Sequence, residues 1–320
     1  MQTTEIQLND LYVAFHKPEN WNGNTLFYVH GGPGSHCKDF EEGIHYFKCF
    51  KNSNLGFITY DQRGSGRSSC TSNNMPHLTH RKNIEDLNFL INSTYEIFSL
   101  KKTPVLFGHS YGARLVYDLL WNYSDIKLDF ILCGTSLHPN DSLNTSLALD
   151  MLVLRQNYPK EFQIAVDVLS QYEGEPYELS PKIRTLFPDL IKRQQERQKY
   201  YWINEKAMHW WNETTQKHNV KDNDEAYFQI VSSFKNEIFN NNSFDPCRLS
   251  QNGISIIGFH DYLMNGSTHH KLIDDKKIIK FRSSAHYPHF EQPELFIEKV
   301  TDFINRTHNN ALETHYRNII

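Results

Sequence analysis

Short apolar runs that stop at glycine or at a polar cluster recur along the first part of the chain. Runs with the length of a buried strand occupy residues 25–29, 55–60, 105–107 and 130–133. Between them, apolar residues over 83–98 and 113–121 recur at helical spacing. Strands that end in glycine and are followed by helices are typical of βαβ units. The pattern therefore predicts an α/β fold, with a mostly parallel sheet flanked by helices.

The segment over residues 139–246 differs from the rest of the chain. It is rich in charged residues, tyrosine and tryptophan, and it contains helical stretches such as 190–201 but no clear strand. After it the α/β pattern resumes, with strands over 253–258 and 278–281 and an amphipathic helix over 295–304. We therefore predict a core of residues 1–138 and 247–320 that is interrupted by a helical lid. Such an insertion is expected over the carboxyl edge of the sheet, where ligands bind.

Composition narrows the class of protein. A chain of 320 residues with 39% hydrophobic and 13% aromatic residues is expected to form a large core. A net charge of −4 and a pI near 6.5 do not favour a nucleic-acid partner. No run of 18 apolar residues predicts a membrane span, and the first residues do not resemble a signal peptide. The five cysteines are scattered and lack C-x-x-C spacing, which indicates reduced thiols in a cytoplasmic protein.

The pentapeptide Gly-His-Ser-Tyr-Gly at 108–112 joins a predicted strand to a predicted helix. Glycine stands two positions before and two positions after Ser110. A serine on a sharp strand-to-helix turn needs small residues at both positions, because a side chain there would meet the crowded backbone. The pentapeptide alone is common by chance, but here it has the flanking elements that the mechanism requires. We predict that Ser110 is a nucleophile; the alternative is an ordinary tight turn that contains a serine.

A nucleophilic serine needs a base, and the base needs an orienting carboxylate. In this architecture the expected chain order is serine, acid, histidine. Asp261 and His286 follow the two late predicted strands, so the order is satisfied. His289, three residues further on, is an alternative base, although it lies closer to the next helix. His30 and His109, both at strand ends, are expected to pack or to form hydrogen bonds.

Two backbone N–H groups are also needed to stabilise the oxyanion. One is expected from Tyr111, directly after the serine, and the other from the loop His-Gly-Gly-Pro-Gly at 30–34. Glycine lets that backbone approach a substrate closely, and proline stiffens the loop. Neither this loop nor residues 64–66 completes a nucleotide-binding glycine motif. The pair His269–His270 lacks a third ligand at suitable spacing, so we predict no metal and no cofactor.

Four features of the chain are found together in one known family. They are His-Gly-Gly-Pro-Gly at 30–34, Tyr-Asp-Gln-Arg-Gly-Ser-Gly-Arg-Ser at 60–68, Gly-His-Ser-Tyr-Gly at 108–112, and the late Asp261 and His286. The combination resembles the proline iminopeptidases, which are prolyl aminopeptidases of the α/β-hydrolase superfamily. The resemblance implies Ser110 as nucleophile, His286 as base and Asp261 as its orienter. It also implies Gly32 and Tyr111 as the oxyanion donors.

The resemblance is weakest in the lid. In that family, lid glutamates hold the free N-terminal amine, and Glu213 and Glu237 lie near the corresponding positions of this chain. The alternative is that both are solvated charges on lid helices. Trp210 and Trp211, with Trp202, either wall an apolar pocket for a pyrrolidine ring or form the core of the lid.

The predicted function is that of a serine hydrolase. The favoured form is an aminopeptidase that releases N-terminal proline, or another N-terminal residue, from small peptides through an acyl-enzyme. The alternative keeps the machinery and changes the substrate to a small ester or another amide. Epoxide hydrolase or dehalogenase chemistry is disfavoured, because those relatives attack with an aspartate where this chain has Ser110. A non-catalytic receptor or scaffold is the third hypothesis, and the complete set of predicted catalytic groups argues against it.

Overall fold

The computed structural model describes residues 1–68, 78–123, 125–126, 128–134, 139–172, 176–239, 253–263 and 275–317. Within these residues, eight strands form one sheet in the order β1-β2-β4-β3-β5-β6-β7-β8. The strands are β1 (Gln2–Leu8), β2 (Leu11–Lys17), β3 (Thr25–Val29), β4 (Gly56–Tyr60), β5 (Val105–His109), β6 (Phe130–Cys133), β7 (Gly253–Gly258) and β8 (Ile278–Phe281). All pairs from β4 to β8 are parallel, which confirms the predicted sheet.

The first two strands were not predicted from the sequence. β1 and β2 form an antiparallel hairpin in which Leu8 pairs with Leu11, and β2 runs antiparallel to β4. Asn9 and Asp10 make the two-residue turn with positive φ angles of 48° and 65°, which asparagine and aspartate tolerate. No residue of β1 is fully buried, so this edge strand has no clear apolar alternation to detect.

Helices cover both faces of the sheet, and each face has its own apolar core. One core includes α3 (His80–Ile97) and α4 (Tyr111–Asn122). The opposite core includes α1 (Lys38–Tyr46), α2 (Lys48–Asn52) and the long closing helix α13 (Pro293–Arg317). Short turns of helix, η3 (Asp275–Lys277) and α12 (Pro288–Glu291), flank β8. The buried strands between the two cores leave only their ends free to carry a site.

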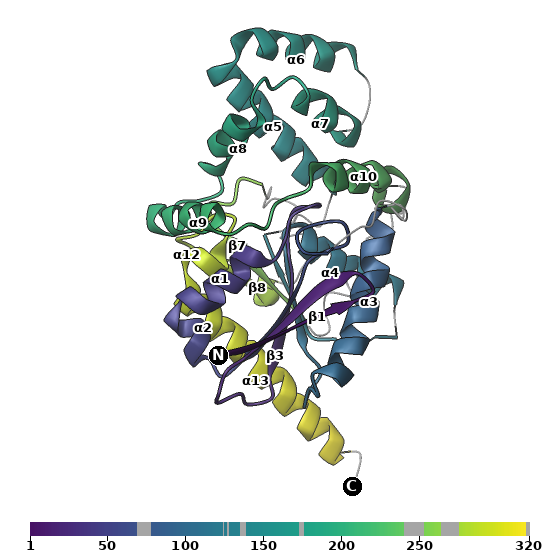
Figure 1. Cartoon of the computed structure of the whole chain (residues 1–320), viewed down its shortest axis with the longest axis vertical. Coiled ribbons are helices and arrows are strands. Elements are labelled where there is room, and N and C mark those ends of the chain that lie inside the picture. The colour runs from purple at the N-terminus through teal and green to yellow at the C-terminus, as the bar shows by residue number, and fades with distance from the viewer. Residues whose placement is uncertain are drawn as a thin grey trace.

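Every described element between residues 139 and 239 is helical, as predicted. The elements are α5 (Pro139–Asn157), α6 (Pro159–Gln171), α7 (Pro176–Arg184), α8 (Leu190–Gln198), α9 (Glu205–Lys217), α10 (Asp224–Phe234) and the π-helix η1 (Lys235–Phe239). Figure 1 shows α5 to α8 stacked beyond one end of the sheet, with α9 and α10 between them and the core. The predicted boundaries, 138/139 and 246/247, fall at or within stretches outside the described residues.

The lid has an apolar cluster of its own. Its buried members come from α5, α6, α7 and the turn after α7: Leu147, Val153, Leu154, Ala165, Leu179, Ile183 and Phe187. None of the tryptophans belongs to this cluster, since Trp202 and Trp210 are buried in the core that contains α1 and α13. The lower part of the lid is thus packed on the α/β core. Among the described residues, no helix is both long and apolar enough to cross a membrane.

Candidate active site

Ser110 occupies a strained backbone position between β5 and α4. Its φ and ψ angles are 54° and −119°, and a non-glycine residue with such a positive φ costs conformational energy. A methyl group on Gly108 would lie 2.5 Å from the Cα of Ala113, and one on Gly112 would lie 2.0 Å from the carbonyl oxygen of Val29. A larger residue would therefore clash at either position, as the sequence predicts. The Ser110 N–H donates to the Cys133 carbonyl at 2.8 Å, which ties the turn to β6.

Asp261 and His286 are brought together by the loops after β7 and β8. His286 Nδ1 donates to Asp261 Oδ2 at 2.9 Å, and both residues are buried. The other carboxylate oxygen, Oδ1, accepts the backbone N–H of Leu263 at 3.0 Å. The carboxylate therefore has a fixed orientation and sets the tautomer of the imidazole, leaving Nε2 free of the proton that Nδ1 holds.

The two rival histidines have different environments. His289 is fully buried, neither ring nitrogen has a hydrogen-bond partner among the described residues, and aromatic rings including Phe107 and Phe296 surround it. Burial, together with the charge of His286, lowers its pKa to about 3. His109 donates from Nε2 to the carbonyl oxygen of His286 at 2.8 Å. Of these three histidines, only His286 pairs with Asp261, while His109 holds the backbone of His286.

The glycine loop 30–34 packs against the Ser110 turn. A methyl group on Gly31 would lie 2.8 Å from Ser110 Cβ, so the loop and the turn touch. His30 donates from Nδ1 to the Gly31 carbonyl and accepts the Gln62 N–H on Nε2, at 2.9 and 3.0 Å. Burial lowers the pKa of His30 to about 4, which keeps the ring neutral, as these two bonds require.

The two predicted oxyanion donors, Gly32 and Tyr111, directly follow Gly31 and Ser110, the two residues in contact. Gly32 has a φ of 64°, a conformation that favours glycine, and it lines the same cavity as Ser110. Tyr111 is the first residue of α4, so its backbone N–H is one of the four that a helix cannot satisfy internally. The partial positive charge of the helix N-terminus lies at the same place. An anionic oxygen beside Ser110 would therefore be stabilised.

Asp61 and Arg63, which belong to the segment 60–68, form ion pairs. Asp61 accepts the backbone N–H groups of Cys37 and Arg67, at 2.8 and 2.7 Å, and the Nε of Arg67 at 2.8 Å. Arg63 donates to both carboxylate oxygens of Asp86, at 2.7 and 2.9 Å. Neither Asp61 nor Asp86 is among the described residues that line the Ser110 cavity.

A cavity of about 210 Å³ contains Ser110 and His286. Six phenylalanine, tyrosine or tryptophan side chains contribute to its wall: Tyr28, Phe40, Tyr201, Trp211, Tyr287 and Phe290. Asp39, in the first turn of α1, is the only acidic residue among the described residues that line it. A second cavity of about 450 Å³ shares Gly32, Asp39 and Trp211 with the first and extends under α8 of the lid. The Ser110 cavity is thus adjoined by a larger cavity on the side of the lid.

The predicted lid residues divide between this cavity and other places. Trp211 lines both cavities, whereas Trp210 stacks on Tyr46 of α1 with ring centroids 5.1 Å apart. Trp202 stacks on Tyr287 at 4.4 Å, directly behind the cavity wall. Trp211 is therefore the tryptophan that a substrate would meet, and the other two fasten the lid to the core.

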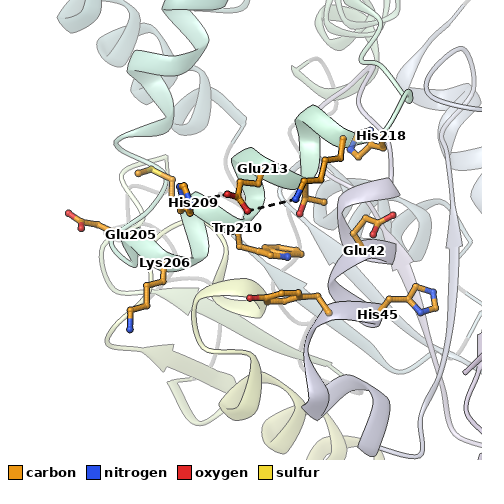
Figure 2. Close-up of a pocket in the computed structure, with 12 residues that line it drawn as sticks. Glu42, His45, Glu205, Lys206, His209, Trp210, Glu213 and His218 are labelled. Carbon is orange, nitrogen blue, oxygen red and sulfur yellow. Dashed lines mark ion pairs between the residues drawn. The ribbon is translucent and has the colours of Figure 1, made fainter.

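The two predicted lid glutamates do not line the Ser110 cavity. Glu213 is 53% exposed and pairs with His209 and Lys217 of its own helix, at 3.1 and 3.9 Å. Figure 2 shows it in an open groove between α1 and α9. Glu237 accepts the backbone N–H of Arg81 at 2.7 Å, at the start of α3. The structure therefore does not bring these two acids together with Ser110.

Glu291, which was not predicted from the sequence, joins the lid to the loop that carries His286. Its Oε2 accepts the Ala285 N–H at 2.6 Å, and its Oε1 accepts the N–H groups of Ile203 and Asn204 at 2.8 and 3.0 Å. The His286 N–H in turn donates to the carbonyl of Tyr201 at 3.0 Å. Glu291 stands five positions after His286 in a short helix, and no spacing rule signals such a role.

Comparisons with solved structures place this fold among known hydrolases. A proline iminopeptidase-related protein from Thermus thermophilus superposes with a TM-score of 0.63 at 17% identity, covering 95% of this chain and 97% of that one. A proline iminopeptidase from Mycobacterium smegmatis gives 0.63 at 17%, covering 97% and 100%. An esterase from Exiguobacterium antarcticum gives 0.60 at 16%, covering 94% and 99%. At these identities the likeness shows the fold alone, and that fold is the predicted α/β-hydrolase fold.

Sequence comparisons identify the family. No curated protein sequence matches the chain. The profile of a hydrolase family described as serine aminopeptidase, S33, matches residues 23–214, which is more than half of the chain and includes Ser110. The chain therefore belongs to the serine aminopeptidase S33 family of hydrolases.

Proposed function

We propose that the protein is a serine aminopeptidase that releases an N-terminal residue, preferably proline, from small peptides. The observation that carries the proposal is the shared cavity: the strained Ser110 lines it together with His286, whose Nδ1 is bonded to Asp261. In such a site the serine hydroxyl can lose its proton to imidazole Nε2 while it attacks an acyl carbon.

The reaction would proceed through an acyl-enzyme. Ser110 Oγ bonds to the carbonyl carbon of the first residue, its proton passes to His286, and the oxyanion lies between the N–H groups of Tyr111 and Gly32. His286 then gives the proton to the leaving amine as the peptide bond breaks. A water molecule, deprotonated by the same imidazole, hydrolyses the ester and restores the serine.

Asp39 supports the choice of an aminopeptidase. An enzyme that selects a free α-ammonium group needs a fixed carboxylate in a partly dehydrated site. Asp39 lies on the wall of both cavities and is held by His218, whose Nε2 is 2.9 Å from Asp39 Oδ1. We therefore assign amine recognition to Asp39 rather than to Glu213 or Glu237.

An esterase is the second candidate, because six aromatic side chains line the Ser110 cavity and suit an uncharged acyl group. Three substrates separate the candidates: proline arylamide, N-acetylproline arylamide and a short-chain ester. An aminopeptidase is expected to cleave the free amine far faster than the acetylated analogue, which lacks the charge. Equal rates on those two arylamides, with faster cleavage of the ester, would contradict the aminopeptidase and support the esterase.

A further inference from the structure

Two histidines and one aspartate converge where the two cavities join. His36, Asp39 and His218 each offer a ligand atom, and these atoms lie within 4.8 Å of one another. They come from two parts of the chain: His36 and Asp39 lie at the start of α1, and His218 caps the end of α9. His36 and His218 are nearly buried, with 6% and 8% of their side chains exposed.

The bonds of His218 leave one ring nitrogen pointing at a carboxylate. Nδ1 lies 3.1 Å from the carbonyl oxygen of Val220, an acceptor that requires a proton on Nδ1. Nε2 then faces Asp39 Oδ1 at 2.9 Å. In the neutral ring, two lone pairs would meet there, so the arrangement needs a positive species between or on these atoms. An imidazole that donates Nδ1–H to a backbone carbonyl and offers Nε2 is the usual arrangement of a metal-binding histidine.

Asp222 lies beside His36, at the edge of this three-residue cluster. The rings of His36 and His218 are 5.1 Å apart at an interplanar angle of 84°, so their edges approach from different directions. His36 Nε2 lies 3.8 Å from Asp222 Oδ1, a carboxylate that Ser35 also holds. A metal ion on His36 Nε2 needs the ring proton on Nδ1, so it gives up the bond that Nδ1 accepts from the Lys38 N–H, which is already long at 3.3 Å.

We propose that His36, Asp39 and His218 bind one Zn²⁺ ion or a similar divalent transition metal ion, with Asp222 as the fourth ligand. Two imidazoles and two carboxylates match the donors and the coordination number of zinc. Magnesium and calcium prefer sets made only of oxygen atoms, so the imidazoles select against them. This site is separate from Ser110, His286 and Asp261, and it does not depend on which acyl substrate is cleaved.

A metal ion here would inhibit hydrolysis. His36 and Asp39 line the Ser110 cavity, and all four ligands line the outer cavity under the lid. The ion would therefore stand on the path to Ser110 and would neutralise Asp39. It would also join the loop before α1 to the end of α9 and so hold the lid against the core. Zinc would therefore be a reversible inhibitor of hydrolysis.

The test is a titration of the tag-free protein with Co²⁺ and Zn²⁺. The visible d–d absorption of bound Co²⁺ is expected to saturate at one equivalent and to disappear when Zn²⁺ displaces it. His218→Ala and Asp39→Asn are each expected to weaken Co²⁺ binding at least about tenfold. Removal of a residue that only supports a metal ligand already costs about that much affinity, and removal of the ligand itself should cost no less. His209→Ala is the matched control, because His209 is 76% exposed on the same helix and lines neither cavity.

Binding and inhibition are measured separately. Zn²⁺ is expected to slow the labelling of Ser110 by a fluorophosphonate over the concentration range of the titration, and a chelator is expected to restore it. Unchanged Co²⁺ absorption in both ligand variants, with melting temperatures that show them folded, would overturn the proposal, as would its loss in His209→Ala alone. Because absorption requires no catalysis, an incorrect assignment of Ser110 would leave this result intact.

Discussion

The loops at the carboxyl edge of the sheet and the helices of the lid hold their polar groups in different ways. At the sheet edge, Asp261, His286 and His30 are buried, and each bonds to a neighbour in another loop. On the lid, Glu213 is half exposed and pairs only within α9. The first region preorganises charge for a reaction, and the second presents a surface that can change without disturbing it. The two regions therefore differ in how firmly their polar groups are held in place.

Removal of the base, His286, is expected to cause the largest loss of activity. His286→Ala is expected to lower kcat/KM by about three orders of magnitude or more, since only binding and the oxyanion donors would remain. His289→Phe is expected to keep most of the activity, because His289 has no hydrogen-bond partner to lose in the part of the chain that the structure describes. Steady-state hydrolysis of the best substrate measures both. A larger loss in His289→Phe than in His286→Ala would show that the base had been assigned to the wrong histidine.

Changing the cavity acid compares the two regions directly. Asp39→Asn is expected to lower kcat/KM for proline arylamide by about 5- to 150-fold, the loss of one charged hydrogen bond of about 1–3 kcal/mol. Ester hydrolysis should change much less, because the ester carries no ammonium group. Glu213→Gln, the matched change on the lid surface, should leave both rates unchanged. The opposite result, with Glu213→Gln selectively impaired on the arylamide, would return amine recognition to α9.

Glu291 links the two regions, and its removal should weaken both. Glu291→Gln replaces a carboxylate oxygen that accepts N–H groups with an amide that donates, so we expect the free energy of unfolding to fall by about 1.5–3 kcal/mol. Urea denaturation of the wild type and variant gives this difference. Glu294→Gln, at an exposed position in the next helix, is the control and should stay within about 0.5 kcal/mol. Equal changes in the free energy of unfolding for the two variants would show that Glu291 does not stabilise the structure.

Acid should destabilise the sheet edge through its buried histidines. Burial lowers the pKa of His30 to about 4 and that of His289 to about 3, while an unfolded histidine has its ordinary pKa near 6.5. Below about pH 6.5 the unfolded chain therefore binds protons that the folded chain does not, and the free energy of unfolding falls as pH decreases toward 4. Each such histidine contributes up to about 1.4 kcal/mol per pH unit.

His289→Phe should make this dependence shallower by the contribution of one histidine. The exposed variant His209→Ala should keep the wild-type slope. Urea denaturation at intervals between about pH 7 and 4.5 provides the comparison. Identical slopes for all three proteins would mean that His289 takes up its proton in the folded state as readily as in the unfolded one.

The sequence was informative wherever local geometry decides the outcome. Gly108 and Gly112 are required by contacts with residues close to Ser110 or in the adjoining strand, so a five-residue motif carried that prediction. The order of Ser110, Asp261 and His286 follows from strand order in the same way. β1 escaped detection because an exposed edge strand needs no apolar alternation.

The acid of the cavity could not be predicted, since its position depends on packing between distant elements. Asp39 faces the site only because the first turn of α1 meets the end of α9, where His218 holds it. Nothing in the spacing of Glu213 or Glu237 reveals that one pairs within its helix and the other binds the start of α3. Glu291 was missed for the same reason, because its partners lie in another part of the chain.

Covalent labelling tests the central assignment most directly. A fluorophosphonate probe should label the wild-type protein once, and peptide mapping should place the label on Ser110. Ser110→Ala should remain unlabelled. Ser35→Ala, which removes the other described serine hydroxyl on the cavity wall, should be labelled like the wild type. Labelling of Ser110→Ala at the wild-type rate, or a label mapped to Ser35, would contradict the account.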